Sequence, residues 1–367
     1  MIFKKLLLLS TLFVTISVFS QIPNGYYDTA TGSGYTLKTQ LKAIISNGHI
    51  DQGYGALYNA YVTSDNDSFY ENDNTVLDMY SENPAGADPY NYSHNGRTCG
   101  NYNSENDCYN REHIFPQGFF NSQVPMRTDI HHVVPSDGYV NGIRGSFPFG
   151  EVSNPDYTTN NGSKRGPNTF DTHSGTVFEP IDEFKGDIAR MLLYFATRYE
   201  DVVTDATWDS HDASVNNPLN GTNDQVYEDW YIKLLYKWHT DDPVSQREIT
   251  RNDAAYTFQG NRNPFIDHPE YVQTIWGSVL SVETFSSLEQ VSIYPNPSTI
   301  NKVTLRIPSS ITIKRIKVYS ILGKEIQSLN NPTLANNKLE ISNLKQGIYL
   351  VKISNDQQNI TKKIVVQ

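Results

Sequence analysis

The stretch that decides the fold is CYNREHIFPQGFF, from Cys108 to Phe120, in which Arg111, Glu112 and His113 stand side by side. Histidine titrates near neutral pH without help, so His113 can take a proton from water, and the rate is expected to rise through roughly pH 6 to 7. Neighbours on a regular strand point to opposite faces, so Glu112 and His113 share a site only where the strand ends or bulges. Pro116, which lacks a backbone donor, favours such a break.

A second stretch, DIHHVVPSDGYVNGIRG from Asp129 to Gly145, supplies a neutral oxygen. Ser136 is expected to cap a short helix over DGYVNG, which places Asn141 about one turn into that helix. A carboxylate and an amide oxygen suit Mg²⁺ or Ca²⁺ better than zinc, and two protein ligands leave room for water and for phosphate oxygens. We therefore expect Glu112, His113 and Asn141 to form one metal site suited to phosphodiester hydrolysis.

Several other residues have a structural alternative to a role in chemistry. A Glu-His pair by itself is more often a surface ion pair than a site. His131 and His132 could be metal ligands, but one is expected to face the core as a hydrogen-bonded imidazole, and both are left outside the predicted site. Arg190, on the polar face of a helix, either pairs with nearby acids or contacts phosphate. The stretch QGNRNPFIDHPEYV, residues 259–272, is interpreted as framework.

Residues 1–20 have the pattern of a signal peptide. MIFKK is a short cationic start, LLLLSTLFVTISVF is an apolar run of signal-peptide length, and residues 18–20 offer small side chains for cleavage before Gln21. A lipid-embedded anchor is the alternative, but no second apolar segment long enough to span a bilayer follows. We therefore expect an exported protein without stable membrane insertion.

Cys99 and Cys108 are the only two cysteines and lie nine positions apart. In an oxidising compartment they are expected to form a disulfide, which for so short a loop contributes about 2 to 3 kcal/mol of stability. The bond would fix the segment that leads into Arg111, or it could be a surface staple unrelated to chemistry. A zinc site needs more cysteine or histidine than this pair offers.

The charge of the chain is unevenly distributed. The chain holds 29 Lys+Arg and 40 Asp+Glu, a net charge of −11. Residues 1–20 hold 2 basic residues, and residues 281–367 hold 11 basic and 5 acidic ones, so residues 21–280 hold 16 against 35 and carry −19. Such acidity opposes purely electrostatic binding of nucleic acid. Substrate binding is therefore expected to be weak and assisted by the metal.

The pattern from residue 21 to about 280 predicts one mixed domain in which helices dominate the second half. Apolar residues at helical spacing predict helices within residues 35–49, 180–201, 225–239 and 245–260, the last ending at Gly260. Polar residues fill 64–110 apart from one strand-like run, TVLDMYS at residues 75–81, and residues 151–170 form a second polar loop.

From residue 286 to 367 the sequence consists of short runs in which apolar and polar residues alternate, separated by turn residues. Examples of these runs are KVTLRI, IKRIKVYSI and GIYLVKIS. This spacing predicts a small all-β sandwich of about 80 residues. No histidine occurs after His268, so every candidate catalytic residue lies before this module.

The motifs of the first domain resemble the endonuclease I family of secreted and periplasmic nucleases. The likeness runs through CYNREHIFPQ, DIHHVVPSDGYVNGIRG, FEPIDEFKGDIARMLLYFATRY and QGNRNPFIDHPEYV and covers most of residues 35–276. It implies an α+β fold in which a ββα-metal, or His-Me finger, core is surrounded by helices. By position, His113 matches the general base, Glu112 and Asn141 match the metal ligands, and Arg144 is a candidate for a phosphate contact, with Arg111 as a weaker one.

The resemblance also implies the reaction. It implies a metal-dependent endonuclease that hydrolyses DNA, and RNA as well, without marked sequence preference and leaves 5′-phosphates. The implied cofactor is Mg²⁺, with Mn²⁺ or Ca²⁺ as alternatives. We expect a monomer.

The C-terminal module resembles the sorting domain of the type IX secretion system, through YPNPS, GKEI, GIYLVKI and the terminal KKIVV. This resemblance implies that the secretion machinery is a partner, that the module is usually removed after outer-membrane passage, and that the protein is extracellular or attached to the cell surface. A carbohydrate- or cell-binding module is the alternative.

Two other functions compete with the nuclease. A phosphodiesterase or phosphatase of smaller substrates could use the same metal site. A non-catalytic surface adhesin would fit the Asn- and Tyr-rich loops and the β module, but Glu112, His113 and Asn141 argue against it.

Overall fold

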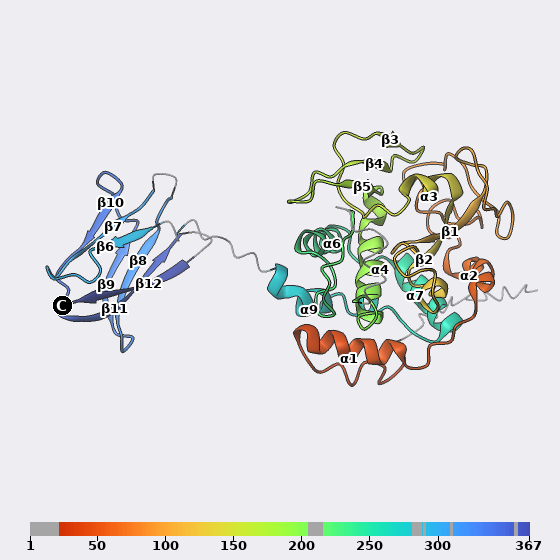
Figure 1. Ribbon diagram of the computed structural model, residues 1–367. Helices are drawn as coiled ribbons and strands as arrows, with labels where there is room; N and C mark the ends of the chain where they lie inside the picture. The colour runs from red at the N-terminus through yellow and green to blue at the C-terminus, as the bar shows by residue number, and fades with distance from the viewer. Residues whose placement is uncertain (1–21, 205–215, 281–287, 289–290, 309–310, 356–358) are drawn as a thin grey trace, which may run out of the picture. The chain divides into compact units, whose positions relative to one another are not determined.

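The computed structural model describes residues 22–204, 216–280, 288, 291–308, 311–355 and 359–367 (Figure 1). The predicted signal peptide lies outside the described residues. The chain divides into two compact units, Met1–Leu280 and Ser281–Gln367. Each unit has a large hydrophobic core of its own.

The first unit contains the expected strand, loop and short helix. Strand β1 (Tyr109–His113) pairs with β2 (Val133–Asp137) in an antiparallel register that sets Glu112 opposite Val134. Helix α3 (Gly138–Arg144) follows β2 directly. The pairing is regular up to the end of β1 at His113, so the strand ends where the sequence required a break.

The N-cap of α3 is Asp137 and not Ser136, so the predicted cap is wrong by one residue. The Asp137 carboxylate accepts a hydrogen bond from the Val140 backbone N–H at 2.9 Å. Ser136 belongs to β2, where it pairs with Asn110. Both residue types can cap a helix, and the carboxylate gains in addition from the positive end of the helix dipole.

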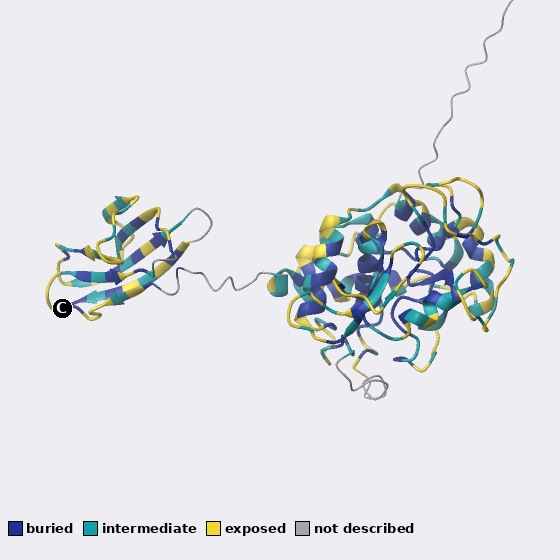
Figure 2. Ribbon diagram, turned by 90° about the horizontal axis from the view of Figure 1, so that it is seen from above, coloured by how far each residue is buried: buried dark blue, intermediate teal, exposed yellow. Residues whose placement is uncertain are grey.

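Helices surround this motif, and α4 runs through the middle of them (Figure 1). Every residue of α4 from Gly186 to Thr197 is buried, as the dark segments at the centre of the unit show in Figure 2. The apolar periodicity at residues 180–201 therefore correctly predicted a helix that faces the core. The helices are α1 (Gly34–Ser46), α2 (Leu57–Ser64), α4 (Lys185–Arg198), α6 (Asp229–Asp241), α7 (Gln246–Gln259), α8 (Pro264–Asp267) and α9 (Tyr271–Leu280), with short 3₁₀ helices η1 (Tyr54–Ala56), η2 (Met126–Thr128) and η3 (Asp182–Phe184).

Both ends of α7 are fixed by local sequence. Ser245 and Glu248 form a reciprocal capping box at its start. The predicted end at Gly260 is confirmed, because this residue adopts a left-handed conformation with φ of 86°. A Cβ at Gly260 would lie 2.5 Å from the Gly48 carbonyl oxygen, so a side chain has no room there.

Residues 75–81 do not form the predicted strand. In this segment Val76 makes an isolated β-bridge to Asn66, and the residues after it turn. Val76, Met79 and Tyr80 are nevertheless buried. The strand-like composition of this run reflects the burial of an irregular segment.

The polar stretch at residues 151–170 holds two short strands where a loop was predicted. β3 (Tyr157–Thr158), β4 (Lys164–Pro167) and β5 (Thr176–Glu179) form an antiparallel sheet in that order. Strands of two to four residues are too short to show a sequence period of two.

The second unit is the expected all-β sandwich. One antiparallel sheet has the order β10–β7–β6 and the other the order β12–β11–β8–β9. Apolar residues of both sheets, such as Leu305 on β7 and Val351 on β11, share one hydrophobic core. The strands are β6 (Ser292–Tyr294), β7 (Val303–Arg306), β8 (Arg315–Ser320), β9 (Glu325–Asn330), β10 (Lys338–Ile341), β11 (Gly347–Ser354) and β12 (Asn359–Val366). Among the residues that the structure describes, no helix is long and apolar enough to cross a membrane.

Candidate active site

A cavity of about 380 Å³ lies where the end of β1, the helix α3 and η1 meet. Its lining contains every residue that the sequence placed in the site. The end of β1 contributes three of them and α3 contributes two. These residues are Arg111, Glu112, His113, Asn141 and Arg144.

The imidazole of His113 is 3% exposed and is held in one orientation. Its Nε2 lies 3.1 Å from the backbone carbonyl oxygen of Arg127, to which it donates a hydrogen bond. This bond fixes the tautomer and leaves Nδ1 to accept a proton. Burial, with the neighbouring His132 ring as a second cause, lowers the pKa of His113 to about 3. The ring is therefore neutral throughout the neutral range, and the expected rise in rate between pH 6 and 7 cannot come from this histidine.

The carboxylate of Glu112 is 2% exposed and is held through Oε1. The Tyr80 hydroxyl donates to Oε1 at 3.1 Å, and Arg144 Nη1 lies 3.2 Å from the same oxygen. Burial raises the pKa of Glu112 to about 7, while the Arg144 charge and the Tyr80 hydrogen bond oppose that rise. A hard, buried carboxylate on the wall of a polar cavity fits a divalent cation.

Asn141 presents its carbonyl oxygen because its amide nitrogen is occupied. The Nδ2 donates to Asn110 Oδ1 at 2.7 Å and lies 3.4 Å from the Arg111 carbonyl oxygen. Oδ1 is thus available as a neutral ligand beside Glu112. The donor set of one carboxylate and one amide oxygen, with space for further oxygens in the cavity, fits Mg²⁺ or Ca²⁺.

Arg111 lines the cavity, is half-buried and lies over two aromatic rings. Its guanidinium is 3.4 Å from the Tyr54 ring centroid and 4.4 Å from that of Tyr58, and Nη1 donates to the Tyr54 carbonyl oxygen at 2.7 Å. The guanidinium of Arg127 lies 4.2 Å from the same Tyr54 ring. Two cations therefore surround one tyrosine next to His113, whose ring stacks 5.9 Å away.

Arg144 contacts the end of β1 from inside the protein and is 1% exposed. Its Nη1 donates to the His113 carbonyl oxygen at 3.0 Å and its Nη2 to the Ile114 carbonyl oxygen at 2.6 Å. The guanidinium also lies 4.7 Å from the Phe149 ring centroid. This geometry braces the end of β1 and the carboxylate of Glu112, whereas Arg111 is the more accessible of the two arginines.

His131 and His132 are both buried imidazoles, as expected of one of them. His131 Nε2 lies 3.0 Å from the Asn261 carbonyl oxygen, and His132 Nε2 lies 2.7 Å from that of Met126. Burial lowers the pKa of each ring to about 4. The cavity lining includes neither ring, which agrees with leaving both outside the predicted site.

Arg190 is fully buried and belongs to the core of the fold. Its Nε and Nη2 donate to the two carboxylate oxygens of Glu248 at 2.5 and 2.8 Å. The alternative that Arg190 contacts phosphate is therefore wrong, and the ion-pair alternative is confirmed. The framework interpretation of residues 259–272 also agrees with the structure, because Asn261, Arg262 and Asn263 are buried and hydrogen-bonded.

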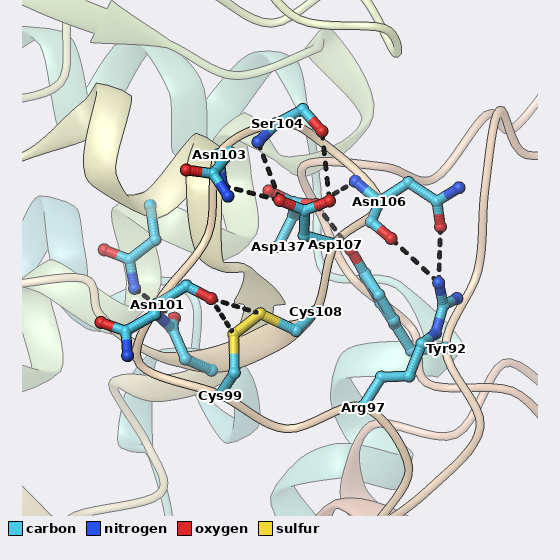
Figure 3. The surroundings of a disulfide bond; sticks show 12 residues. Tyr92, Arg97, Cys99, Asn101, Asn103, Ser104, Asn106, Asp107, Cys108 and Asp137 are labelled. Carbon is cyan, nitrogen blue, oxygen red and sulfur yellow. Dashed lines mark hydrogen bonds between the residues drawn. A yellow bond between two sulfur atoms is a disulfide. The ribbon is translucent and has the colours of Figure 1, made fainter.

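The disulfide between Cys99 and Cys108 is present, as predicted, with a Cα–Cα distance of 5.8 Å (Figure 3). Inside the closed loop, the Asp107 carboxylate accepts hydrogen bonds from the Asn103 and Ser104 backbone N–H groups at 2.6 and 3.0 Å. The loop also reaches α3, because the Asn106 N–H donates to Asp137 at 2.8 Å.

The disulfide loop contributes to the site and is not only a cross-link at the surface. Cys99, Gly100 and Tyr102 form part of the cavity lining. A Cβ at Gly142 on α3 would lie 2.7 Å from the Tyr102 hydroxyl oxygen, so this ring packs directly on the helix that carries Asn141. The loop therefore forms one wall of the site.

Sequence reasoning missed three contributors to this site. Tyr54 in η1 and Tyr80 in an irregular segment are distant in sequence from the motifs, whereas Arg127 in η2 lies between the two motifs. Each of the three contacts a predicted residue. No local pattern marks these three, because their role depends on tertiary packing.

Comparisons with known proteins agree with this geometry. Residues 33–270 match the sequence model of the family described as Endonuclease I, and residues 292–367 match that of a secretion system C-terminal sorting domain. An extracellular ribonuclease of Bacillus amyloliquefaciens is 36% identical over 257 residues, which cover 68% of this chain and 78% of the relative. An extracellular ribonuclease of Bacillus subtilis (strain 168) is 34% identical over 257 residues, which again cover 68% of this chain and 78% of the relative.

These matches confirm a nuclease that hydrolyses phosphodiester bonds, secreted or held at the cell surface, and exclude the adhesin alternative. The second unit is the sorting domain that its motifs suggested, in place of a carbohydrate-binding module. The chain belongs to the endonuclease I family.

Proposed function

We propose that the protein is a metal-dependent endonuclease that cleaves both DNA and RNA by activating water at His113, without marked sequence preference. The observation that carries this proposal is the cavity in which His113, Glu112 and Asn141 converge. The first residue offers a neutral base, and the other two offer oxygen ligands. The protein is expected to act as a monomer, because all these groups come from one chain.

His113 is the proposed general base. The hydrogen bond from Nε2 to the Arg127 carbonyl holds the ring so that Nδ1 receives the proton of the attacking water. The low pKa keeps Nδ1 unprotonated at neutral pH. The Arg127 carbonyl also stabilises the ring once it becomes charged, because it accepts from the opposite nitrogen.

Glu112 Oε and Asn141 Oδ1 are the proposed metal ligands. A divalent ion bound there, which we take to be Mg²⁺ with Mn²⁺ or Ca²⁺ as alternatives, supplies charge stabilisation for the phosphate and the leaving 3′ oxygen. Arg144 holds Glu112 in place from inside the protein. We assign Arg144 this positioning role in addition to its predicted phosphate contact.

Arg111 is the proposed phosphate contact, with Arg127 beside it. Both guanidiniums lie over the ring of Tyr54, which lines the cavity together with Arg111, so they would place positive charge beside the backbone of a bound nucleic acid. The domain around them is acidic, and these cations therefore act locally.

The choice of water as nucleophile decides which nucleic acids are substrates. A base that activated the ribose 2′-OH would cleave RNA alone and leave cyclic phosphates, whereas a base that activates water can cleave DNA and RNA alike and leave 5′-phosphates. The relatives are named extracellular ribonucleases, which supports RNA among the substrates.

The test uses the full chain, residues 21–367, on plasmid DNA and on a 5′-labelled RNA, with and without EDTA. Cleavage of both with 5′-phosphate ends, abolished by EDTA and restored by Mg²⁺, is the expected result. Cleavage of RNA alone with cyclic phosphate ends would overturn the proposed nucleophile. Hydrolysis of a nitrophenyl diester without cleavage of plasmid would instead support a phosphodiesterase of smaller substrates.

For export, we propose that the second unit engages the type IX secretion machinery and is removed after outer-membrane passage. Its match to the sorting-domain family and its separate core support this role. The mature N-terminus is expected at Gln21.

A further inference from the structure

A second group of carboxylates lies outside the cavity, between α2 and β1. Asp67, Glu71 and Glu82 each offer one oxygen, and these oxygens lie within 4.8 Å of one another. Glu71 is exposed, whereas Asp67 and Glu82 are each 1% exposed. The lining of the cavity that holds His113 includes none of the three.

The carboxylate of Glu82 is buried without a partner. Neither of its oxygens makes a hydrogen bond, and the same is true of Asp67 Oδ2. Asp67 Oδ1 accepts from the Tyr70 backbone N–H at 3.2 Å. Three buried carboxylate oxygens are thus unsatisfied, and one shared proton can link at most two of them, so at least one still lacks a partner.

No basic side chain neutralises this cluster. In the part of the chain that the structure describes, no lysine or arginine forms an ion pair with any of the three acids. The charge of Arg247 acts to lower the pKa of Glu82, but its guanidinium forms an ion pair with Asp187. Burial, together with Asp88, Glu71 and Asp67, raises the pKa of Glu82 to about 9. When the three acids are ionised, no lysine or arginine in the described part of the chain pairs with their charge, and the raised pKa of Glu82 reflects the cost of ionising it there.

We propose that Asp67, Glu71 and Glu82 bind a Ca²⁺ ion. Three carboxylates form an all-oxygen donor set, and the ion supplies the partner that the buried oxygens of Asp67 and Glu82 lack. Ca²⁺ accepts six to eight oxygens in a tolerant geometry, which suits ligands on irregular segments, whereas Mg²⁺ demands a near-ideal octahedron and zinc favours nitrogen and sulfur. Extracellular sites of this kind bind in the range of about 10⁻⁴ to 10⁻³ M.

The proposed ion would brace the segment that supports the active site. This segment runs from Asp78 to Glu82 and contacts the site twice. The Asp78 carboxylate accepts from the Asp137 backbone N–H at 2.8 Å, at the start of α3, and Tyr80 donates to Glu112. Ca²⁺ at Glu82 would tie the far end of this segment to Asp67 and Glu71, so we assign the ion a stabilising role.

The test is thermal unfolding of the full chain, residues 21–367, freed of metal with EDTA, returned to about 5 mM MgCl₂ so that the cavity is occupied, and then measured with and without about 5 mM CaCl₂. Wild type is expected to gain roughly 3 to 8 °C in Tm with calcium. Glu82→Gln is expected to gain none. In EDTA its Tm should equal or exceed that of wild type, because glutamine keeps the size of the side chain and its amide can donate to Asp67 Oδ2, which lacks a partner.

Two control variants separate this site from others. Glu112→Gln, which changes the cavity, should keep the full calcium-dependent gain and should retain one Ca²⁺ per chain by elemental analysis. Glu228→Gln removes an exposed acid before α6 and should also keep the gain. If Glu82→Gln fails to fold, Glu71→Gln serves instead, because this side chain is exposed, and it should weaken calcium binding at least tenfold.

Three results would overturn the proposal. Wild type could show no gain with calcium, Glu82→Gln or Glu71→Gln could keep the full gain, or Glu112→Gln could lose it. The last result would place the calcium in the cavity. None of these readouts depends on cleavage, so they stand apart from the test of the proposed function.

Discussion

Glu112 and Glu82 are both buried carboxylates, but their surroundings differ. Glu112 accepts a hydrogen bond from Tyr80 and lies against Arg144, whereas neither oxygen of Glu82 has a partner. Burial raises the pKa of Glu112 to about 7 and that of Glu82 to about 9. The partners keep Glu112 close to ionisation at neutral pH, with its oxygen held in place. Glu82 lacks such partners, and the proposed Ca²⁺ ion would supply them.

The largest expected effect lies in the cavity, at His113. His113→Ala removes the base and leaves both proposed ligands, so the cleavage rate should fall by about 10² to 10⁴ while Mg²⁺ still binds. Initial rates on plasmid DNA and calorimetric Mg²⁺ titration measure the two quantities. Added imidazole should restore part of the rate and extra Mg²⁺ should not. A variant that cleaves at nearly the wild-type rate would remove His113 from catalysis.

The comparison of the two carboxylates can be tested directly through the metal requirement. Changes to groups that merely orient a ligand weaken metal binding by about 10- to 100-fold, so Glu112→Gln should raise the Mg²⁺ needed for half-maximal cleavage at least tenfold. High Mg²⁺ should recover part of the rate. Glu82→Gln is the matched change and should leave the Mg²⁺ requirement within about threefold of wild type. Equal shifts in both variants would show that the two acids serve one site.

The two pKa values in the cavity predict an unusual pH dependence. Protons compete with metal at Glu112, so at limiting Mg²⁺ the rate should rise by up to about tenfold per pH unit below pH 7. At saturating Mg²⁺ this rise should disappear, because His113, with a pKa of about 3, is already unprotonated. Rates between pH 5 and 8 at two Mg²⁺ concentrations measure this. A rise through pH 6 to 7 that persists at saturating Mg²⁺ would point to a histidine with an ordinary pKa.

Tyr80 connects the two regions, and its removal should have a moderate effect. Tyr80→Phe deletes the hydrogen bond to Glu112 and leaves the ring in the core, so the Mg²⁺ requirement should rise by about threefold to tenfold. The calcium-dependent gain in Tm should remain. Loss of that gain in Tyr80→Phe would show that the two regions are coupled more tightly than the contacts suggest.

The smallest effect is expected from removing the second unit. The second unit has a separate core, and the residues that line the cavity all lie between Tyr54 and Ser146. A chain that ends at residue 280 should therefore cleave DNA within about twofold of the full-length rate, while its release from the native host should fail. A folded but inactive truncation would reveal a role for the sorting domain in catalysis.

The grouping of Glu112, His113 and Asn141 around one cavity could be predicted because these residues lie in continuous motifs. Glu112 and His113 are neighbours, and Asn141 follows on a short helix, so residue type and spacing sufficed. The proposed calcium ligands had no such signal. Asp67, Glu71 and Glu82 occur in a segment crowded with acids and asparagines, and only the burial of Asp67 and Glu82 distinguishes them from exposed acids.

Errors in the predicted fold have local physical causes. Ser136 and Asp137 can both cap a helix, and the strand pairing that decides between them lies outside the local sequence. The run at residues 75–81 has the composition of a strand because residues 76–81 are all buried, but its pairing is limited to the single bridge from Val76 to Asn66. The role of Arg190 could not be predicted, because an arginine on the polar face of a helix can form a buried ion pair or remain an exposed cation. Only the tertiary structure shows the buried pair with Glu248.

The pair of guanidiniums around Tyr54 has a consequence for how the enzyme moves between cuts. Arg111 and Arg127 concentrate attraction for nucleic acid at one spot, while residues 21–280 as a whole carry −19 and repel the rest of the strand. A substrate held at one point by a repelling body dissociates soon after it is cut. The enzyme should therefore work distributively, making scattered nicks on many molecules before it digests any one of them completely.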